Sequence, residues 1–319
     1  MKQPGNNFAR YLLIVLAITY INYQTAAAQQ LKWIPFYWET EVIEGRSIPD
    51  FSITIPVKIE SLQDPFKMQL DLGSAQTFIY GNSFAPYLNQ DKEILNALDS
   101  SGGFYAEGKR YPVFRDFKLK LGQVDVPPLN VGYYEGYGQR YETGKPAMEN
   151  KKLIGTIGCD IFLNKVLILD YPHQRIAISD HIPAQFAGIS LEPVSIEGGR
   201  IVVSLNIDSR KQRLLFDTGS SMFSLLTTQH NVIGISEDAV IDSLKTTSWG
   251  DVYYVYQKKL NSPIRLGNHE LKSGDVFYDK IEKFDRFYDN QNIWGIIGNK
   301  CFRNNILIID FSNSKIGML

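Results

Sequence analysis

Cysteine and histidine are scarce in this sequence, and their scarcity limits the chemistry that it can support. The 319 residues include two cysteines, Cys159 and Cys301, and four histidines. The histidines form no cluster and no His-Glu-x-x-His motif, so we predict neither a metal site nor a cofactor. The cysteines leave two interpretations open: one disulfide in an exported protein, or, as we favour, two buried thiols.

An excess of positive charge is also missing. The 33 Lys and Arg residues nearly balance the 34 Asp and Glu residues, which gives a formal net charge of -1. Nucleic-acid-binding surfaces need a concentration of basic residues, so we expect no nucleic-acid partner. The sequence also lacks a glycine-rich phosphate-binding loop and a Gly-x-Ser-x-Gly motif, which argues against a nucleotide site and a serine hydrolase.

Long apolar runs are absent beyond the N-terminal region. There, the basic residues Lys2 and Arg10 precede an apolar run at 11–21, and three alanines end at Ala28. This pattern predicts a signal peptide over residues 1–28, cleaved before Gln29, with an uncleaved N-terminal anchor as the alternative. We therefore expect an exported mature chain without a membrane span, in the periplasm or outside the cell.

Helical periodicity is scarce, whereas short strand-like runs recur along the chain. Alternating or β-branched residues gather in segments such as 53–59, 118–121 and 201–205, which turn-forming residues separate. Aromatic residues make up 13% of the chain, and their flat side chains pack well on pleated sheets. These features predict an all-β protein with many short strands and one short helix at 89–99.

The most informative pattern is an internal repeat. Three blocks recur in the same order, which indicates a tandem duplication of one β-rich half. We predict two lobes, at 29–190 and 191–319, that face each other across a pseudo-twofold axis. The repeated blocks are 68–74 with 214–220, 155–158 with 295–298, and 162–171 with 302–311.

The repeat supplies one acidic residue in each half, Asp71 and Asp217. Each follows an apolar strand and begins an Asp-x-Gly-Ser turn, whose glycine lets the backbone turn tightly near the carboxylate. If the two turns meet at the axis, both carboxylates cannot ionise together, and the pair holds one proton. One member then accepts a proton from water while the other donates to a carbonyl oxygen, which amounts to general acid–base hydrolysis of an amide.

The motifs around these acids resemble those of aspartic peptidases. The segment 217–221 (Asp-Thr-Gly-Ser-Ser) resembles the active-site signature. The segment 296–298 (Ile-Ile-Gly), with its counterpart at 156–158, resembles the apolar element beneath the catalytic loop. The chain is similar to bacterial retropepsin-like proteins, with the two-lobe arrangement of pepsin in one chain. This implies two β-barrel lobes of the acid-protease type with a central cleft.

The resemblance also implies roles for individual residues. Asp71 and Asp217 would be the catalytic pair of an aspartic endopeptidase that works without a cofactor. Its substrate would be a peptide or a protein, and we expect a monomer. The residues that would support the pair are Gly73, Ser74, Thr218, Gly219 and Ser220.

The first motif departs from the family at Leu72, where the family has threonine or serine. That hydroxyl belongs to a hydrogen-bond grip across the axis, and a leucine side chain can neither donate nor accept. Two functions therefore stay open: an aspartic peptidase, or a weakly active or inactive module that binds peptides or envelope proteins. A third interpretation is a processing enzyme for one cell-envelope partner.

Aspartic peptidases cover their cleft with a hairpin, and the segment 102–108 is the candidate here. The resemblance implies that Tyr105 or Tyr111 leans over the acidic pair. The alternative is an exposed hairpin whose tyrosines pack on their neighbours.

Asp170 and Asp310 repeat as well, but neither precedes a glycine. We interpret both as strand-end carboxylates, each paired with the basic residue five positions later, Arg175 or Lys315.

Overall fold

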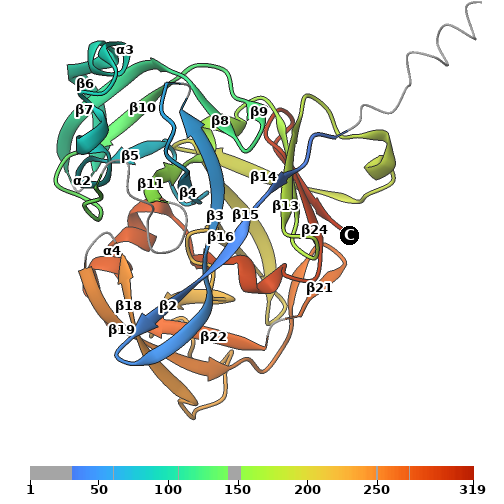
Figure 1. Cartoon of the computed structure of the whole chain (residues 1–319). Coiled ribbons are helices and arrows are strands. Elements are labelled where there is room, and N and C mark those ends of the chain that lie inside the picture. Colours follow the sequence, from blue (N-terminus) through green and yellow to red (C-terminus); the bar gives the residue numbers. More distant parts are fainter. Residues whose placement is uncertain (1–30, 60, 107, 143–151, 249–250, 273) are drawn as a thin grey trace, which may run out of the picture.

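The computed structural model describes residues 31–59, 61–106, 108–142, 152–248, 251–272 and 274–319. The predicted signal peptide lies outside the described residues. Strands dominate the described chain and form one sheet of 15 strands and one of 10, so the all-β prediction is confirmed. Figure 1 shows two lobes, with blue and green strands in one and orange and red strands in the other.

The 10-stranded sheet belongs to the first half of the chain. Its order is β6-β7-β10-β5-β11-β4-β3-β8-β9, and β2 pairs with β3. Side chains on β4 and β8 alternate between buried and partly exposed positions, which places their apolar residues in the core of the lobe. The strands are β2 (Tyr37–Ile43), β3 (Arg46–Ile59), β4 (Phe66–Leu70), β5 (Phe78–Tyr80), β6 (Leu98–Ala106), β7 (Lys109–Phe117), β8 (Leu119–Leu121), β9 (Val124–Asp125), β10 (Leu129–Tyr134) and β11 (Lys152–Ile157).

The 15-stranded sheet combines the second half of the chain with three strands from the first. Its order is β1-β13-β12-β24-β25-β14-β15-β16-β23-β17-β22-β19-β18, and β20 pairs with β15 and β21. Strands β1 (Ile34–Pro35), β12 (Val166–Asp170) and β13 (Arg175–Ser179) precede β14 (Leu191–Glu197), β15 (Arg200–Ile207), β16 (Arg210–Phe216), β17 (Leu225–Thr228), β18 (Asp242–Ser248), β19 (Asp251–Lys259), β20 (Ile264–Leu266), β21 (His269–Leu271), β22 (Asp275–Asp279), β23 (Gly295–Ile297), β24 (Ile306–Asp310) and β25 (Lys315–Met318).

The duplication is visible in the strand pairing. In the first half, β4 is parallel to β11, β11 is antiparallel to β5, and β5 is parallel to β10. In the second half, β16, β23, β17 and β22 repeat these three relations in the same order. The acid of each half follows the first strand of this set, so the fold places both acids in the same local setting.

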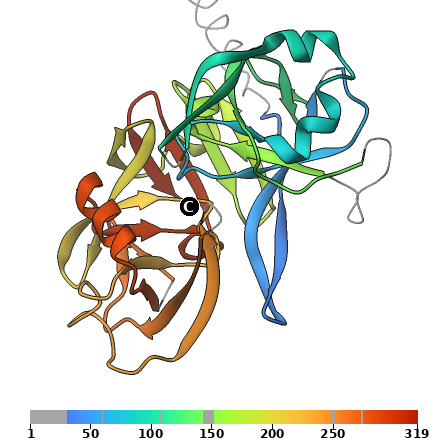
Figure 2. The ribbon, with the colours of Figure 1, turned by 90° about the vertical axis from the view of Figure 1, so that its left-hand side faces the viewer.

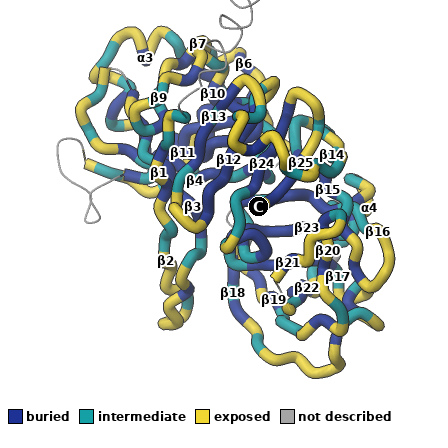
Figure 3. Tube along the Cα trace, turned by 90° about the vertical axis from the view of Figure 1, so that its right-hand side faces the viewer, coloured by how far each residue is buried: buried dark blue, intermediate teal, exposed yellow. Residues whose placement is uncertain are grey.

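The two halves join through β12 and β24. These strands are antiparallel, and Ile168 pairs with Ile308. Ile308 lies 140 residues after Ile168, the same offset that relates Gly158 to Gly298 in the sequence repeat. A residue paired with its own repeat counterpart marks the position of the pseudo-twofold axis. Figure 3 shows both strands as buried, between the two lobes.

A long hairpin formed by β2 and β3 extends away from the first lobe along the second, as Figure 2 shows. Near its tip, Arg46 forms an ion pair with Asp242 at 2.5 Å, and Lys245 of β18 pairs with Glu44 at 2.8 Å. Solvent screens such exposed pairs, so they contribute little to stability. Their effect is to fix where the hairpin lies against β18.

Helices are few among the described residues. The predicted helix at 89–99 corresponds to α3 (Lys92–Ala97), where the Asp91 side chain accepts a hydrogen bond from the Glu93 N–H at 2.7 Å as an N-cap. Two further helices, α2 (Gly81–Phe84) and α4 (Glu282–Gln291), were not predicted. Within the described chain, none of the helices has both the length and the apolar character needed to cross a membrane.

Both cysteines are buried free thiols, which confirms the interpretation that we favoured. Each thiol donates to a main-chain carbonyl of its own lobe: Cys159 to Leu72 at 3.2 Å and Cys301 to Ser224 at 3.4 Å. Cys159 therefore lies against the Asp-x-Gly motif of its half, whereas Cys301, in the second half, lies against the chain beyond the motif of that half.

Candidate active site

Asp71 and Asp217 begin equivalent turns at the ends of β4 and β16. The N–H of each acid donates to the last carbonyl of the neighbouring strand, β11 or β23, at 3.0 Å. Each carboxylate then accepts from the glycine N–H two residues later, at 2.9 Å from Gly73 and 2.7 Å from Gly219. The Asp-x-Gly repeat thus builds the same acid turn twice.

A second glycine lies beneath each turn, in the apolar element of the sequence repeat. A Cβ on Gly158 would come within 2.5 Å of the Gln76 main chain, and one on Gly298 within 2.0 Å of the Ser220 carbonyl oxygen. Side-chain atoms do not fit at such distances. The element therefore packs directly under the turn, as the resemblance implied.

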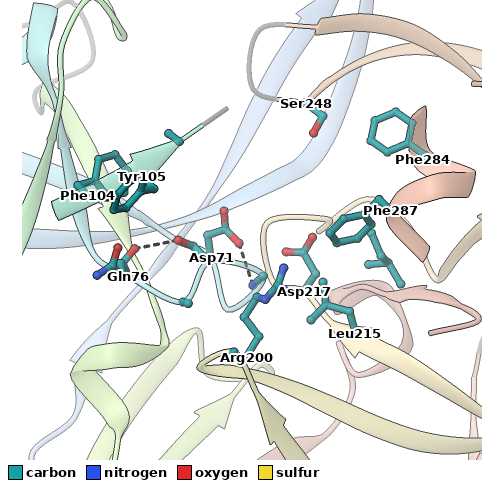
Figure 4. Close-up of a pocket in the computed structure, with 16 residues that line it drawn as sticks. Asp71, Gln76, Phe104, Tyr105, Arg200, Leu215, Asp217, Ser248, Phe284 and Phe287 are labelled. Carbon is teal, nitrogen blue, oxygen red and sulfur yellow. Dashed lines mark hydrogen bonds between the residues drawn. The ribbon is translucent and has the colours of Figure 1, made fainter. Parts of the chain in front are cut away.

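The two turns meet, and the glycine of each lies against the acid of the other. A Cβ on Gly73 would lie 2.5 Å from Cγ of Asp217, and one on Gly219 would lie 2.8 Å from Cγ of Asp71. The same Cβ on Gly219 would lie 3.0 Å from Oδ1 of Asp217, so a single point lies within 3.0 Å of both carboxyl groups. Figure 4 shows the acids side by side, one from each lobe. The structure therefore brings the two predicted acids together, at a range where both cannot be ionised.

The pKa of the Asp71 carboxyl lies well above its ordinary value. Burial is the largest cause because desolvation disfavours the charged form, and the charge and hydrogen bond of Asp217 add to the shift. The N–H groups of Gly73 and Ser74 oppose it. A raised pKa keeps a proton on the pair at pH values where an ordinary carboxyl is ionised.

Thr218 links the two turns across the axis. Its buried hydroxyl donates to the Leu70 carbonyl at 2.9 Å and accepts from the Leu72 N–H at 2.8 Å. The Leu72 side chain is fully buried in the core and cannot return equivalent bonds. One half of the grip expected from the family is thus formed, and Thr218 keeps two partners although position 72 lacks a hydroxyl.

The second turn rests on a buried polar network that the sequence did not reveal. The Asn299 side-chain amide donates to the Thr218 carbonyl at 2.8 Å and to the Ser221 hydroxyl at 2.7 Å. The Tyr171 hydroxyl, from the first half of the chain, donates to the Asn299 side-chain oxygen at 2.8 Å. Three side chains therefore hold the main chain directly after Asp217.

The first turn has apolar or weakly polar residues at the corresponding positions. Cys159 corresponds to Asn299, and Phe311 corresponds to Tyr171. The Cys159 thiol donates to the Leu72 carbonyl, just as the Asn299 side-chain amide donates to the Thr218 carbonyl. A thiol, however, is a weaker hydrogen-bond donor than an amide. The Asp71 turn therefore lacks the side-chain amide that supports the second turn, and its side-chain polar support comes from the Thr218 hydroxyl of the other lobe.

A cavity of about 740 Å³ opens beside the acids. Residues of both lobes line it, including Tyr105 of β6 and Phe284 and Phe287 of α4 (Figure 4). A second cavity of about 190 Å³ contains both acids in its wall as well. The acids thus lie in a cleft that both lobes line.

Comparison with solved structures agrees with this architecture. The chain is similar to the crystal structure of an aspartic proteinase from Irpex lacteus, with a TM-score of 0.50 and 11% sequence identity, over 90% of this chain and 96% of that chain. The chain has the aspartic-proteinase fold. No protein-family model matches the sequence, and no curated protein matches it. At 11% identity the likeness shows the fold, and any inference about activity depends on the site itself.

In this aspartic-proteinase fold, the hairpin of β6 and β7 occupies the place of the predicted cleft cover. Tyr105 is 65% exposed and lines the larger cavity. Tyr111 instead packs against Phe104 and Tyr134, with ring centroids 6.1 and 4.9 Å apart. Of the two predicted tyrosines, Tyr105 is therefore the one that faces the cleft. Glu107, in the predicted segment 102–108, lies outside the described residues.

Two of the predicted supporting residues act through their main chain. The Ser74 hydroxyl donates to the Gln76 carbonyl at 2.8 Å, and the Ser74 N–H donates to the Asp71 main-chain carbonyl at 3.2 Å. The Ser220 N–H approaches the Asp217 carboxylate at 3.3 Å. Among the described hydrogen bonds, neither serine hydroxyl contacts an acidic side chain, because the turn geometry directs the main-chain N–H groups toward the aspartates instead.

The other repeated acids lie outside both cavities. Asp170 accepts from Arg175 Nε at 2.8 Å, which confirms the predicted ion pair. Asp310 accepts instead from the main-chain and side-chain amides of Asn313, each at 2.9 Å. The predicted pairing with Lys315 is wrong for the described residues, since Asn313 lies closer along the turn and satisfies both carboxylate oxygens.

The sequence analysis missed Arg200, Phe284 and Phe287, which line the larger cavity. The two phenylalanines and Tyr288 recur at intervals of three and four residues, a spacing typical of a helix, and this signal could have revealed α4. No motif marks Arg200. Among the described residues, no three His, Cys, Asp or Glu side chains gather in a group that could hold a metal ion.

Proposed function

We propose that this protein is an exported aspartic-type endopeptidase. The observation that carries the proposal is the close approach of the Asp71 and Asp217 carboxyls where the two turns meet, within a cleft lined by both lobes. Two acids in such contact share one proton and can exchange their roles as acid and base. Nothing in the arrangement requires a metal or a covalent intermediate.

The proposed reaction uses one water molecule. The ionised carboxyl accepts a proton from the water, whose oxygen attacks the carbonyl carbon of the peptide bond, while the protonated carboxyl donates to the carbonyl oxygen. The tetrahedral intermediate then breaks at the C–N bond: the leaving nitrogen takes the proton from the pair, and a hydroxyl of the intermediate returns one to it, so the pair again holds one proton. The raised pKa of Asp71, caused mainly by burial, favours Asp71 as the member that holds the proton first.

The proposed substrate is an extended peptide segment. The larger cavity is lined by Tyr105 of the β6–β7 hairpin on the first-lobe side and by Ser248 of β18 on the other. A peptide in extended conformation could form strand-like hydrogen bonds with such a hairpin. Apolar side chains of the peptide would contact Phe284 and Phe287.

The test is cleavage of a peptide library between about pH 3 and 7 by the wild type, Asp71→Asn and Asp217→Asn. We expect each substitution to lower kcat by roughly 100- to 10,000-fold because it removes one acid–base partner. Asp238→Asn, which changes an exposed acid outside both cavities, serves as the control and should cleave like the wild type. Cleavage that survives in both site variants would contradict the proposal.

One observation favours a second function, the binding of peptides without cleavage. The Thr218 hydroxyl bonds to the first turn but Leu72 returns no such bond, and Cys159 stands where Asn299 supports the second turn, so the two turns are not equivalent. The same assay separates the two functions. A wild type that binds library peptides but cleaves none of them over the whole pH range would favour the binding module.

A further inference from the structure

The larger cavity contains a basic side chain close to the acids. Of the 16 described residues that line it, only Arg200 is basic, and the only carboxylic acids are Asp71 and Asp217. Arg200 begins β15, directly after the glycine pair 198–199. The turn that precedes it lies against the first acid turn, because a Cβ on Gly199 would be 3.1 Å from Cβ of Ala75.

The Arg200 side chain is fixed on the side that faces α4. Its Nη2 donates to the Gln291 side-chain oxygen at 2.5 Å, and its guanidinium carbon lies 5.8 Å from the Phe287 ring centroid. Both partners are uncharged. Figure 4 shows the guanidinium reaching into the cavity beside the two acids.

Acidic neighbours do not neutralise this guanidinium. The cross-strand neighbour Glu197 forms a bidentate contact with Arg213 at 2.7 and 2.8 Å. No ion pair between described residues includes Arg200, so Asp71 and Asp217 lie beyond ion-pair distance of it. A planar fork of donors, held on one side by a neutral amide, suits bidentate binding of a carboxylate.

We propose that Arg200 makes this protein select substrates with a carboxylate close to the scissile bond. The proposal rests on the proposed peptidase function, and it adds the chemical class of the substrate. The carboxylate belongs either to an acidic side chain or to the chain terminus of a short peptide. A carboxylate must lie nearer to Arg200 than to the acidic pair, because a pair with one proton carries one negative charge and repels it.

The test measures binding separately from cleavage. The probes are fluorescent peptides of one sequence in which a reduced –CH₂–NH– link replaces the scissile amide, so that none of them can be cleaved. Glutamate or glutamine is placed at each of the positions that flank this link, and each peptide has a free or an amidated C-terminus. Binding is measured by fluorescence polarisation at about pH 6, where a peptide glutamate is ionised.

We expect at least tenfold tighter binding for one glutamate peptide than for its glutamine counterpart, or for one free terminus than for its amide. Arg200→Gln should abolish this preference, so that the charged and neutral members of each peptide pair bind with equal affinity. Arg200→Lys should restore only part of it, because lysine lacks the planar fork. Arg210→Gln, at an exposed position in the same lobe, should keep the full preference. Thermal melting of each variant checks that it is folded.

Equal binding of charged and neutral peptides at every position would overturn the proposal, and so would a preference that persists in Arg200→Gln. The preference for glutamate or for the free terminus identifies the source of the carboxylate. Cleavable versions of the same peptides test the function independently. A wild type that cleaves none of them contradicts the peptidase function, while the binding result still decides the role of Arg200.

Discussion

Replacing Thr218 by valine removes the hydroxyl that links the two acid turns and keeps the shape of the side chain. The hydroxyl satisfies two buried main-chain groups of the first lobe, the Leu70 carbonyl at 2.9 Å and the Leu72 N–H at 2.8 Å. A buried polar group left without a partner costs about 1–3 kcal/mol. With two such groups, we expect Thr218→Val to lower the free energy of unfolding by about 2–6 kcal/mol.

Thermal unfolding followed by circular dichroism measures this loss. For a chain of this size, about 1 kcal/mol corresponds to roughly 2–4 °C, so Tm should fall by at least about 4 °C. Thr218→Ser keeps the hydroxyl and should lose much less. Thr247→Val, at an exposed position of β18, makes the same chemical change where no buried bond depends on it, and its Tm should stay near that of the wild type. A Thr218→Val protein that melts within about 1 °C of the wild type would refute the role assigned to this hydroxyl.

Three further changes test other parts of the site. At pH values above about 4, Asp71→Asn should raise Tm relative to the wild type, and the increase should grow with pH; below about pH 4 it should vanish. The reason is that the folded state raises the pKa of this carboxyl, so above about pH 4 the unfolded state binds fewer protons there than the folded state. Asp279→Asn should act likewise, since burial raises the pKa of Asp279 to about 6, which corresponds to about 3 kcal/mol at pH 7; a Tm difference that does not depend on pH would contradict this. Leu72→Thr should lower Tm, because it removes buried apolar volume worth about 2–3 kcal/mol, and should raise kcat of peptide cleavage if the hydroxyl completes the grip.

The sequence could predict the acids because they are repeated with their surroundings. The spacing between each Asp-x-Gly turn and its downstream glycine predicted which strands lie beneath the acids, and β11 and β23 occupy those places. A repeat predicts what both halves share. It therefore indicated the fold, the axis and the contact between Asp71 and Asp217.

The rest of the site could not be predicted because it differs between the halves. Asn299 supports the second turn and Cys159 takes its place in the first, and this difference has no signature in a short motif. Arg200 likewise occurs in one half only. It lies at the start of β15, and the apolar alternation of a strand does not predict which residues its first side chain will contact. The direction of a serine hydroxyl depends on local turn geometry, so the sequence could name Ser74 but not its partner, Gln76.

The pairing of β12 with β24 makes each half a partner for the other. All five residues of β12 are buried, and its edge bonds to β24 along its whole length. A half produced as a separate polypeptide would expose this apolar edge to water, and such edges recruit another strand. Because Ile168 and Ile308 occupy equivalent places, a second copy of the same half could take the vacant position. Two separately produced halves should therefore assemble by fragment complementation, with self-assembly of each half as the competing reaction.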